Sequence, residues 1–286
     1  MDWKKTEIIF IVAFLLLDIF LGIMFLNKQV TNDPDKLGND TLQDHLKTDN
    51  ITYPDLSSKS VYGEIFTANK VAFASKDLVD LKDQSIALYN NSTEIVSTLQ
   101  NPVKTGKKGE NPEFIKFLQE NVYKGSTYEF WKYDETTHEL IYNQVIKDDM
   151  VLFDNAGRIV FKLNNDEEVI SYRQTYLGKQ DDLQEKKNLL SSMDALEAVY
   201  QHGDLKPDSE ITQAVFGYYT TVQLSSGDVY FPVWCFEVVH KKTTSYFLVN
   251  AKDEQVINLT ETKKQEAEKA AASVPQTDFE LAQFDQ

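Results

Sequence analysis

The longest apolar run of the chain lies at its N-terminus, where residues 8–26 are almost wholly apolar. At about 1.5 Å per residue this run is long enough, as a helix, to cross a membrane once. No small-x-small cleavage site follows it, so the pattern predicts a retained signal anchor over residues 1–27. Lys4 and Lys5 precede the run, and Lys28 alone follows it closely, which favours a cytoplasmic N-terminus with the bulk of the chain outside the cell.

A single acid, Asp18, interrupts the apolar run. Its insertion cost of about 2.5–3.5 kcal/mol is smaller than the gain from the surrounding apolar residues, so the segment is still expected to insert. The acid is either tolerated in its protonated form or bonded to a polar group on a partner helix. Gly22 lies one turn further on and shares a helix face with Asp18, Leu15 and Ile11, so a partner helix could approach closely there. These four residues are the candidate interaction site in the membrane.

Residues 28–59 have the pattern of a stalk, with polar residues, Asp33-Pro34 and Gly38 at its start. Within it, Thr41-x-x-Asp44 followed by apolar Leu42 and Leu46 predicts a short helix with a capping box.

Residues 60–178 predict a first α+β module. A helix is expected from Pro112 to Val122, because apolar residues recur on one face and Gly125 follows its end. A loop is expected at 101–111. Alternating β-branched and aromatic residues predict strands at 60–66, 71–74, 85–89, 94–99, 128–133, 138–146, 150–153, 158–163 and 168–177.

Residues 179–260 repeat this order and predict a second module. A charged helical lead is expected at 181–190, followed by a helix that Ser191-x-x-Asp194 caps and Gly203 ends. Both halves therefore predict a helix followed by an antiparallel β-meander, so the fold class is α+β. Residues 261–286 predict a polar, disordered tail. The strands of the second meander are expected at 214–223, 229–240, 245–250 and 255–259.

Composition supports a folded domain outside the membrane that does not bind nucleic acid. The chain is 42% hydrophobic and 12% aromatic, which is ample for a buried core. Its net charge is −16, nearly all of it beyond residue 27, and such a surface repels nucleic acid and anionic lipid. The simpler reading of this charge is that it keeps the domain soluble. Cys235 is the single cysteine, so no internal disulfide can form.

No catalytic or metal-binding motif occurs in the sequence, and none of its four histidines lies at ligand spacing from another. This pattern predicts a non-enzymatic protein without a metal or cofactor. Three aromatic residues on predicted strands, Tyr218, Tyr219 and Trp234, remain candidates for an interaction surface, although strand aromatics are more often half-buried core. Alternation places Tyr218 and Tyr219 on opposite faces of their strand.

A set of short stretches along the chain bears on its family. They are Met1 to Thr6, Ile8 to Ile11, Phe14 to Leu21, Leu46 to Ile51, Tyr53-Pro54, Gly217 to Tyr219 and Pro232 to Trp234. These stretches resemble the YycI (WalI) family of membrane-anchored accessory proteins, whose members act on the essential cell-wall two-component system of Gram-positive bacteria. The resemblance implies that the anchor and the ectodomain associate with a YycH-like sister protein and with a WalK-type sensor histidine kinase, and it implies no catalytic residues.

Three hypotheses for the function follow. The first is a non-enzymatic regulator, anchored by one transmembrane helix in the cell membrane, that modulates the kinase. The second is an extracytoplasmic module that senses a ligand derived from the cell wall, for which a pocket lined by Tyr219 or Trp234 would be diagnostic. The third is a wall hydrolase, which the missing motifs disfavour. Whether the chain forms a homodimer or a heterodimer stays open.

Overall fold

A computed structural model describes residues 41–106, 109–224 and 227–259, together with Trp3, Phe14, Leu15, Leu17 and Asp18. The chain divides into two units, Met1–Asp49 and Asn50–Gln286. Within the described residues, no helix is both long and apolar enough to span a membrane. The stalk residues 28–40, the tail 261–286 and most of the predicted anchor lie outside the described residues.

The first unit contains the short helix α2 (Leu42–Thr48). The Thr41 side chain accepts a hydrogen bond from the Asp44 backbone, and the Asp44 carboxylate accepts one from the Thr41 backbone at 3.0 Å. This reciprocal pair is the capping box that the sequence predicts, because a Thr and an acid three residues apart satisfy two backbone donors at a helix start.

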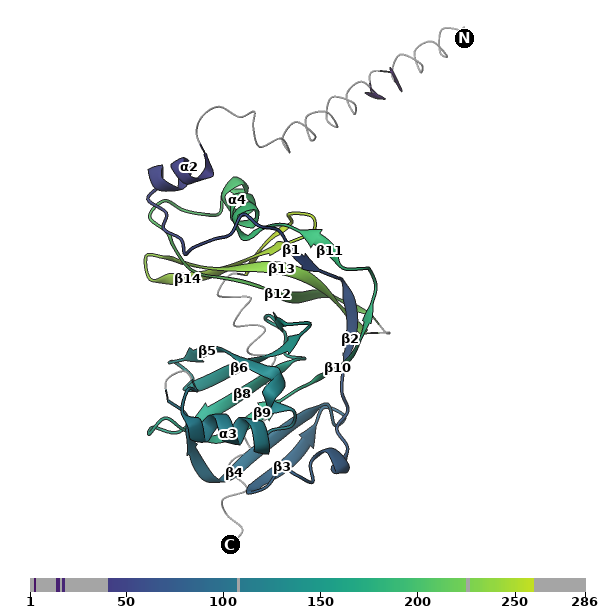
Figure 1. Cartoon of the computed structure of the whole chain (residues 1–286), viewed down its shortest axis with the longest axis vertical. Coiled ribbons are helices and arrows are strands. Elements are labelled where there is room, and N and C mark those ends of the chain that lie inside the picture. Colours follow the sequence, from purple (N-terminus) through teal and green to yellow (C-terminus); the bar gives the residue numbers. More distant parts are fainter. Residues whose placement is uncertain are drawn as a thin grey trace. The chain divides into compact units, whose positions relative to one another are not determined.

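The second unit is built mainly on antiparallel strands. Within the described residues, 13 strands form one continuous sheet, which we divide at strand β6 (Glu139–Ile146) into a first and a second sheet that share this strand (Figure 1). In the first sheet, the strand order is β5-β6-β8-β9-β4-β3, and every neighbouring pair is antiparallel. Its other strands are β3 (Gln84–Tyr89), β4 (Glu94–Lys104), β5 (Tyr128–Asp134), β8 (Arg158–Leu163) and β9 (Glu168–Gln174).

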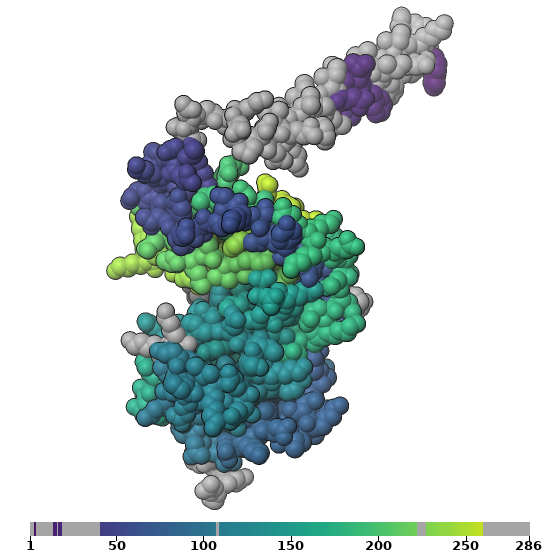
Figure 2. Space-filling view, viewed as in Figure 1, coloured from purple at the N-terminus to yellow at the C-terminus, as the bar shows by residue number. Residues whose placement is uncertain are grey.

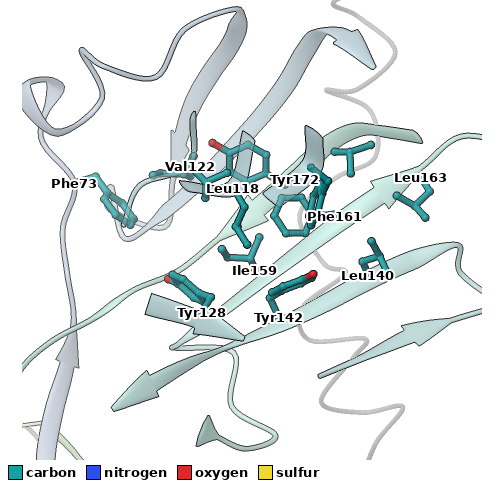
Figure 3. Packing of buried hydrophobic residues seen from close by; sticks show 13 residues of the cluster. Phe73, Leu118, Val122, Tyr128, Leu140, Tyr142, Ile159, Phe161, Leu163 and Tyr172 are labelled. Atoms are coloured by element: carbon teal, nitrogen blue, oxygen red, sulfur yellow. The ribbon is translucent and has the colours of Figure 1, made fainter. Parts of the chain in front are cut away.

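Helix α3 (Pro112–Asn121) covers one face of the first sheet. Asn111 caps it and Pro112 occupies its first turn, as residues at a helix start commonly do. Its buried residues Phe114 and Leu118 pack into an aromatic cluster with Tyr142, Phe161 and other sheet residues (Figure 3). The Phe114 ring lies 5.1 Å from that of Phe161, edge to face. This cluster is the core of the first sheet.

The second sheet contains four consecutive antiparallel strands after helix α4 (Ser192–His202). A Ser191–Asp194 capping box starts this helix, and Gly203, with a φ of 83°, ends it. The four strands are β12 (Glu210–Leu224), β13 (Gly227–His240), β14 (Thr243–Asn250) and β15 (Val256–Leu259). The predicted α+β class is therefore confirmed, and the division into two helix-plus-meander modules stays a prediction.

Segments from the first half complete the second sheet. Strand β2 (Phe66–Lys70) pairs with β13 and with β10 (Leu177–Asp182), and β7 (Asp149–Val151) pairs with β12 in parallel. Strands β1 (Val61–Gly63) and β11 (Lys187–Leu189) form a separate two-stranded ribbon. The sheets therefore do not follow the order of the sequence, and the module boundaries at 60, 178 and 260 stay predictions.

The two sheets pack face to face through a second buried cluster, in which Trp131 and Ile141 of the first sheet meet Val233, Cys235 and Leu248 of the second. The space-filling view shows the teal residues of the first sheet directly against the green strands of the second half (Figure 2). The second unit is thus one continuous packed body.

Several local predictions are wrong. Residues 71–74 form no strand, and the 3-10 helix η1 (Ser75–Asp77) follows them. The charged segment at 181–190, which was expected to be helical, contains the end of strand β10 and all of strand β11 instead. The reason is that β10 and β11 each pair with a strand from residues 61–70. The loop expected at 101–111 begins later, since β4 continues to Lys104. The strand expected at 168–177 is divided into β9 and β10. A second 3-10 helix, η2 (Gly125–Thr127), follows α3.

Candidate functional site

Six strands of the second unit surround one buried core. They follow one another in the order β10-β2-β13-β12-β7-β6, and we call them the ring. The core cluster takes at least one residue from each strand, and the Phe66 ring lies 4.8 Å from that of Tyr218 and 5.2 Å from that of Tyr230. Its members are Phe66, Ala68, Ile146, Val151, Ala156, Leu177, Tyr218 and Tyr230.

Side chains, rather than a backbone ladder, join β6 to β10 and so close the ring. The Gln144 amide donates to the Leu177 carbonyl at 2.9 Å, and its oxygen accepts from the Leu177 N–H at 2.8 Å. Gln144 is buried, and its two bonds satisfy the backbone N–H and carbonyl of Leu177. They replace the two backbone hydrogen bonds that a neighbouring strand would supply. We call these bonds, together with the ion pairs of Lys147, the seam.

The charged end of the seam is centred on Lys147. Its ammonium lies 2.6 Å from Glu64 Oε1, between β1 and β2, and 2.7 Å from Asp182 Oδ1, at the end of β10. Lys147 and Asp148 form the two-residue turn between β6 and β7, and both have positive φ, 55° and 75°, as type I′ hairpin turns require. The turn therefore places the Lys147 ammonium beside two carboxylates, those of Glu64 and Asp182, that are distant in sequence.

Carboxylates outnumber cations around this turn. Burial, the neighbouring Asp148 and Glu64 raise the pKa of Asp149 to about 6, against an opposing effect of Lys186. Glu64 is largely buried, with 12% of its side chain exposed, and its second carboxylate oxygen has no hydrogen-bond partner within the described part of the chain. Burial, with the charges of Glu64, Asp149 and Asp182, also raises the pKa of Tyr218.

Strand β7 connects the ring to the first sheet and requires a glycine opposite it. Met150 and Val151 pair with Gly217 and Tyr218 of β12, and the Leu152 N–H donates to the Tyr218 carbonyl at 2.8 Å. A Cβ at Gly217 would lie 2.4 Å from the Met150 carbonyl oxygen, closer than such atoms approach. The close approach of these two strands thus depends on glycine at this position.

The three aromatic candidates of the sequence lie in three different environments. Tyr218 is buried in the core of the ring. Tyr219, on the opposite face of β12, packs against the cluster between the two sheets. Trp234 is half-buried, its indole N–H donates to the Leu190 carbonyl at 3.0 Å, and its ring lies 5.3 Å from that of Phe216. The structure does not bring them together, and their role in binding a partner stays a prediction.

Of the four membrane candidates, Asp18 and Leu15 are described, and both are helical and exposed. Gly22 and Ile11 lie outside the described residues. The contact that the sequence predicts for these four residues therefore stays a prediction.

Cys235 lies in a buried core, and His202 contacts a neighbouring acid. Cys235 is buried between the sheets, and burial raises the pKa of its thiol. His202 Nδ1 lies 2.9 Å from an Asp204 carboxylate oxygen just beyond the end of α4. Across residues 41–106, 109–224 and 227–259, no group of three or more His, Cys, Asp or Glu residues is arranged to hold a metal ion.

Comparison with known proteins identifies the family. The YycI protein family matches residues 31–252, which is most of the chain. The chain belongs to the YycI family. No curated protein matches its sequence. The match confirms the family that the sequence resembles, and it includes the stretches at 46–51, 53–54, 217–219 and 232–234.

Solved structures similar to this YycI-family chain have low sequence identity to it. An uncharacterized protein from Eubacterium rectale is 9% identical, with a TM-score of 0.45 over 73% of this chain and 89% of that one. YycH from Bacillus subtilis is 14% identical, with a TM-score of 0.41 over 72% of this chain and 54% of that one. The YpeB C-terminal domain from Bacillus megaterium is 10% identical, with a TM-score of 0.35 over 68% and 90%.

Sequence reasoning missed the seam in this YycI-family member. Asp148 and Asp149 form an acidic pair between the strands expected at 138–146 and 150–153, and acids are common in such turns. Their partners Glu64 and Asp182 lie far away along the chain, so no local pattern links them. A lysine beside two acids in a tight hairpin turn was the one available signal.

Proposed function

We propose that this chain is a non-enzymatic accessory regulator that associates with a WalK-type sensor histidine kinase and a YycH-like sister protein. The observation that carries the proposal is the family match over residues 31–252. Through this association the chain modulates two-component signalling that controls cell-wall metabolism.

A single transmembrane helix anchors the regulator in the proposed arrangement. The apolar run at residues 8–26 and the lysines before it support a cytoplasmic N-terminus, with the folded domain on the outer side of the membrane of a Gram-positive bacterium. The anchor then lies in the same bilayer as the transmembrane segments of the kinase, so the anchor helix can contact those segments directly.

Asp18 is the residue proposed to bond a polar group on the partner helix, with Gly22 allowing close approach. Interhelical hydrogen bonds in lipid average about 0.6 kcal/mol and reach about 1.7 kcal/mol, so Asp18→Leu should weaken partner binding by about 3-fold, and at most about 18-fold. Gly22→Leu should act in the same direction, because its side chain holds the helices apart. Leu16→Ala, off the Asp18 face, is the matched control and should have less effect.

The measurement is co-purification of the kinase and the sister protein from detergent-solubilised membranes, at matched levels of each variant. A chain lacking residues 1–27 separates the contribution of the anchor from that of the folded domain. Failure of the intact chain to recover either partner would refute the proposed function. Equal recovery by the parent and Asp18→Leu would place the contact on the folded domain instead.

A further inference from the structure

The two arginines of the chain, Arg158 on β8 and Arg173 on β9, lie on the same face of the first sheet. Arg173 is directly opposite Val160, and Arg158 precedes Val160 by two residues, so the three side chains share a face. Their sequence neighbours Ile159 and Tyr172 point the other way, into the core under α3. We call the face that carries Arg158, Val160 and Arg173 the arginine face.

A buried amide on this face requires a hydrogen-bond acceptor. Asn143 of β6 lies directly opposite Arg158 and is fully buried. The Arg158 Nε–H donates to Asn143 Oδ1 at 3.3 Å, which fixes the orientation of the amide, because the reversed amide would set one N–H group against another. Asn143 Nδ2 has no hydrogen-bond partner in the part of the chain that the structure describes. A buried donor of this kind is costly to leave unpaired.

A carboxylate is the acceptor that this corner of the sheet fits best. Asn143 and Arg158 are bonded to each other, so an amide donor and a guanidinium lie side by side, and both groups donate to carboxylate oxygens. Arg173 adds a second positive charge at the diagonal position of the strand pair. Val160, and Val96 opposite Arg173, add apolar surface between and beside the charges. The face therefore suits an acidic segment that also carries apolar side chains.

We propose that residues 276–286 of this chain dock on the arginine face and place a carboxylate against Asn143 and Arg158. This segment carries acids and large apolar residues but no lysine or arginine, so its chemistry matches both the charged and the apolar parts of the face. Its acids are Asp278, Glu280 and Asp285, and its large apolar residues are Phe279, Leu281 and Phe284.

The chain leaves the second sheet beside this face. Leu259 ends β15 and belongs to the buried cluster that contains Ile141, which lies directly opposite Val160. Strands β8 and β9 are therefore one and two strands away from the exit point, about 5 and 10 Å. Residues 260–275 can span several times this distance. Because the segment belongs to the same chain, its effective concentration at the face is on the order of millimolar, which favours it over a separate acidic peptide.

Site-specific photocrosslinking of the full-length chain in detergent tests the docking. A benzophenone amino acid in place of Val160, or of the exposed Lys162 on the same strand, should crosslink within the chain to residues 276–286, as mapped by mass spectrometry. The same probe in place of Ile115, on the exposed side of α3 and so on the other side of the sheet, should not. If neither probe on the arginine face crosslinks to residues 276–286, or if both crosslink only to a second chain, the proposal is overturned.

Charge substitutions identify the contact. A combined variant that neutralises the three acids of the segment keeps its size and its apolar residues and should lower the crosslink yield about 5-fold, as expected for loss of one exposed charge pair. Arg173→Gln should lower the yield in the same way. Lys116→Gln, which removes an exposed cation on α3, is the matched control and should leave the yield unchanged. An unchanged yield in the acid-neutralised variant would contradict the carboxylate contact. The three substitutions are Asp278→Asn, Glu280→Gln and Asp285→Asn.

Discussion

The first sheet and the ring are stabilised in different ways. Backbone ladders join every neighbouring pair of strands in the first sheet, and α3 covers its aromatic core. The ring has a similar apolar core, but side chains close it between β6 and β10. The first sheet therefore holds together through backbone hydrogen bonds alone, whereas the ring depends on one side chain, that of Gln144, for its closure.

The largest expected effect is in the first sheet. Phe114→Ala removes a fully buried ring that contacts Phe161 and Tyr142, so it should lower the free energy of unfolding by about 3–5 kcal/mol. Chemical denaturation of the full-length chain gives this value. Ile115→Ala, at the neighbouring position with 41% exposure, is the control and should change stability little. A small effect of Phe114→Ala would show that the core under α3 is not what holds this sheet.

Closure of the ring is tested at Gln144. Gln144→Met keeps the length of the side chain but leaves the Leu177 N–H and carbonyl unpaired in a buried site, at a cost of about 2–4 kcal/mol. Hydrogen exchange should locate this loss at β10 and leave α3 protected. Gln201→Met, on the exposed face of α4, is the matched control. Equal loss of protection in both sheets would mean that the seam and the first sheet open as one unit.

A smaller effect is expected where β7 meets β12. Gly217→Ala places a methyl group against the Met150 carbonyl, so the strands must separate, at a cost of about 1–3 kcal/mol. Thermal unfolding of the variant measures this cost. Thr221→Ala, at an exposed position on the same strand, should be nearly neutral. If Gly217→Ala were as stable as the parent, the close approach of β7 and β12 would not be needed for the fold.

Local signals predicted the elements whose causes are local. The capping boxes at Thr41 and Ser191 and the stop at Gly203 depend on residues within one turn of each other, and all three are present. The start of α3 at Pro112 was likewise predictable. In each case, the residues that decide the structure are neighbours in the sequence.

Long-range pairing explains what the sequence could not show. Charged residues at 181–190 favour a helix by propensity, but this segment gains more from pairing with β2 and β1, which lie more than 100 residues earlier. The seam was hidden for the same reason, because Gln144 and Lys147 find their partners through the fold. Tyr218 and Tyr219 were correctly placed on opposite faces of β12, since alternation is a local property.

Strand β13 has a consequence for how the chain is made. Along one edge it pairs first with β2, at residues 228–230, and then with β14, from Val233 onward. Pro232, which has no N–H to donate, lies where one partner replaces the other. During synthesis, β2 emerges about 160 residues before β13 and must wait for it unpaired. The domain can complete its fold only after nearly its whole length has been delivered, so interrupted synthesis would leave an open strand edge available to other chains.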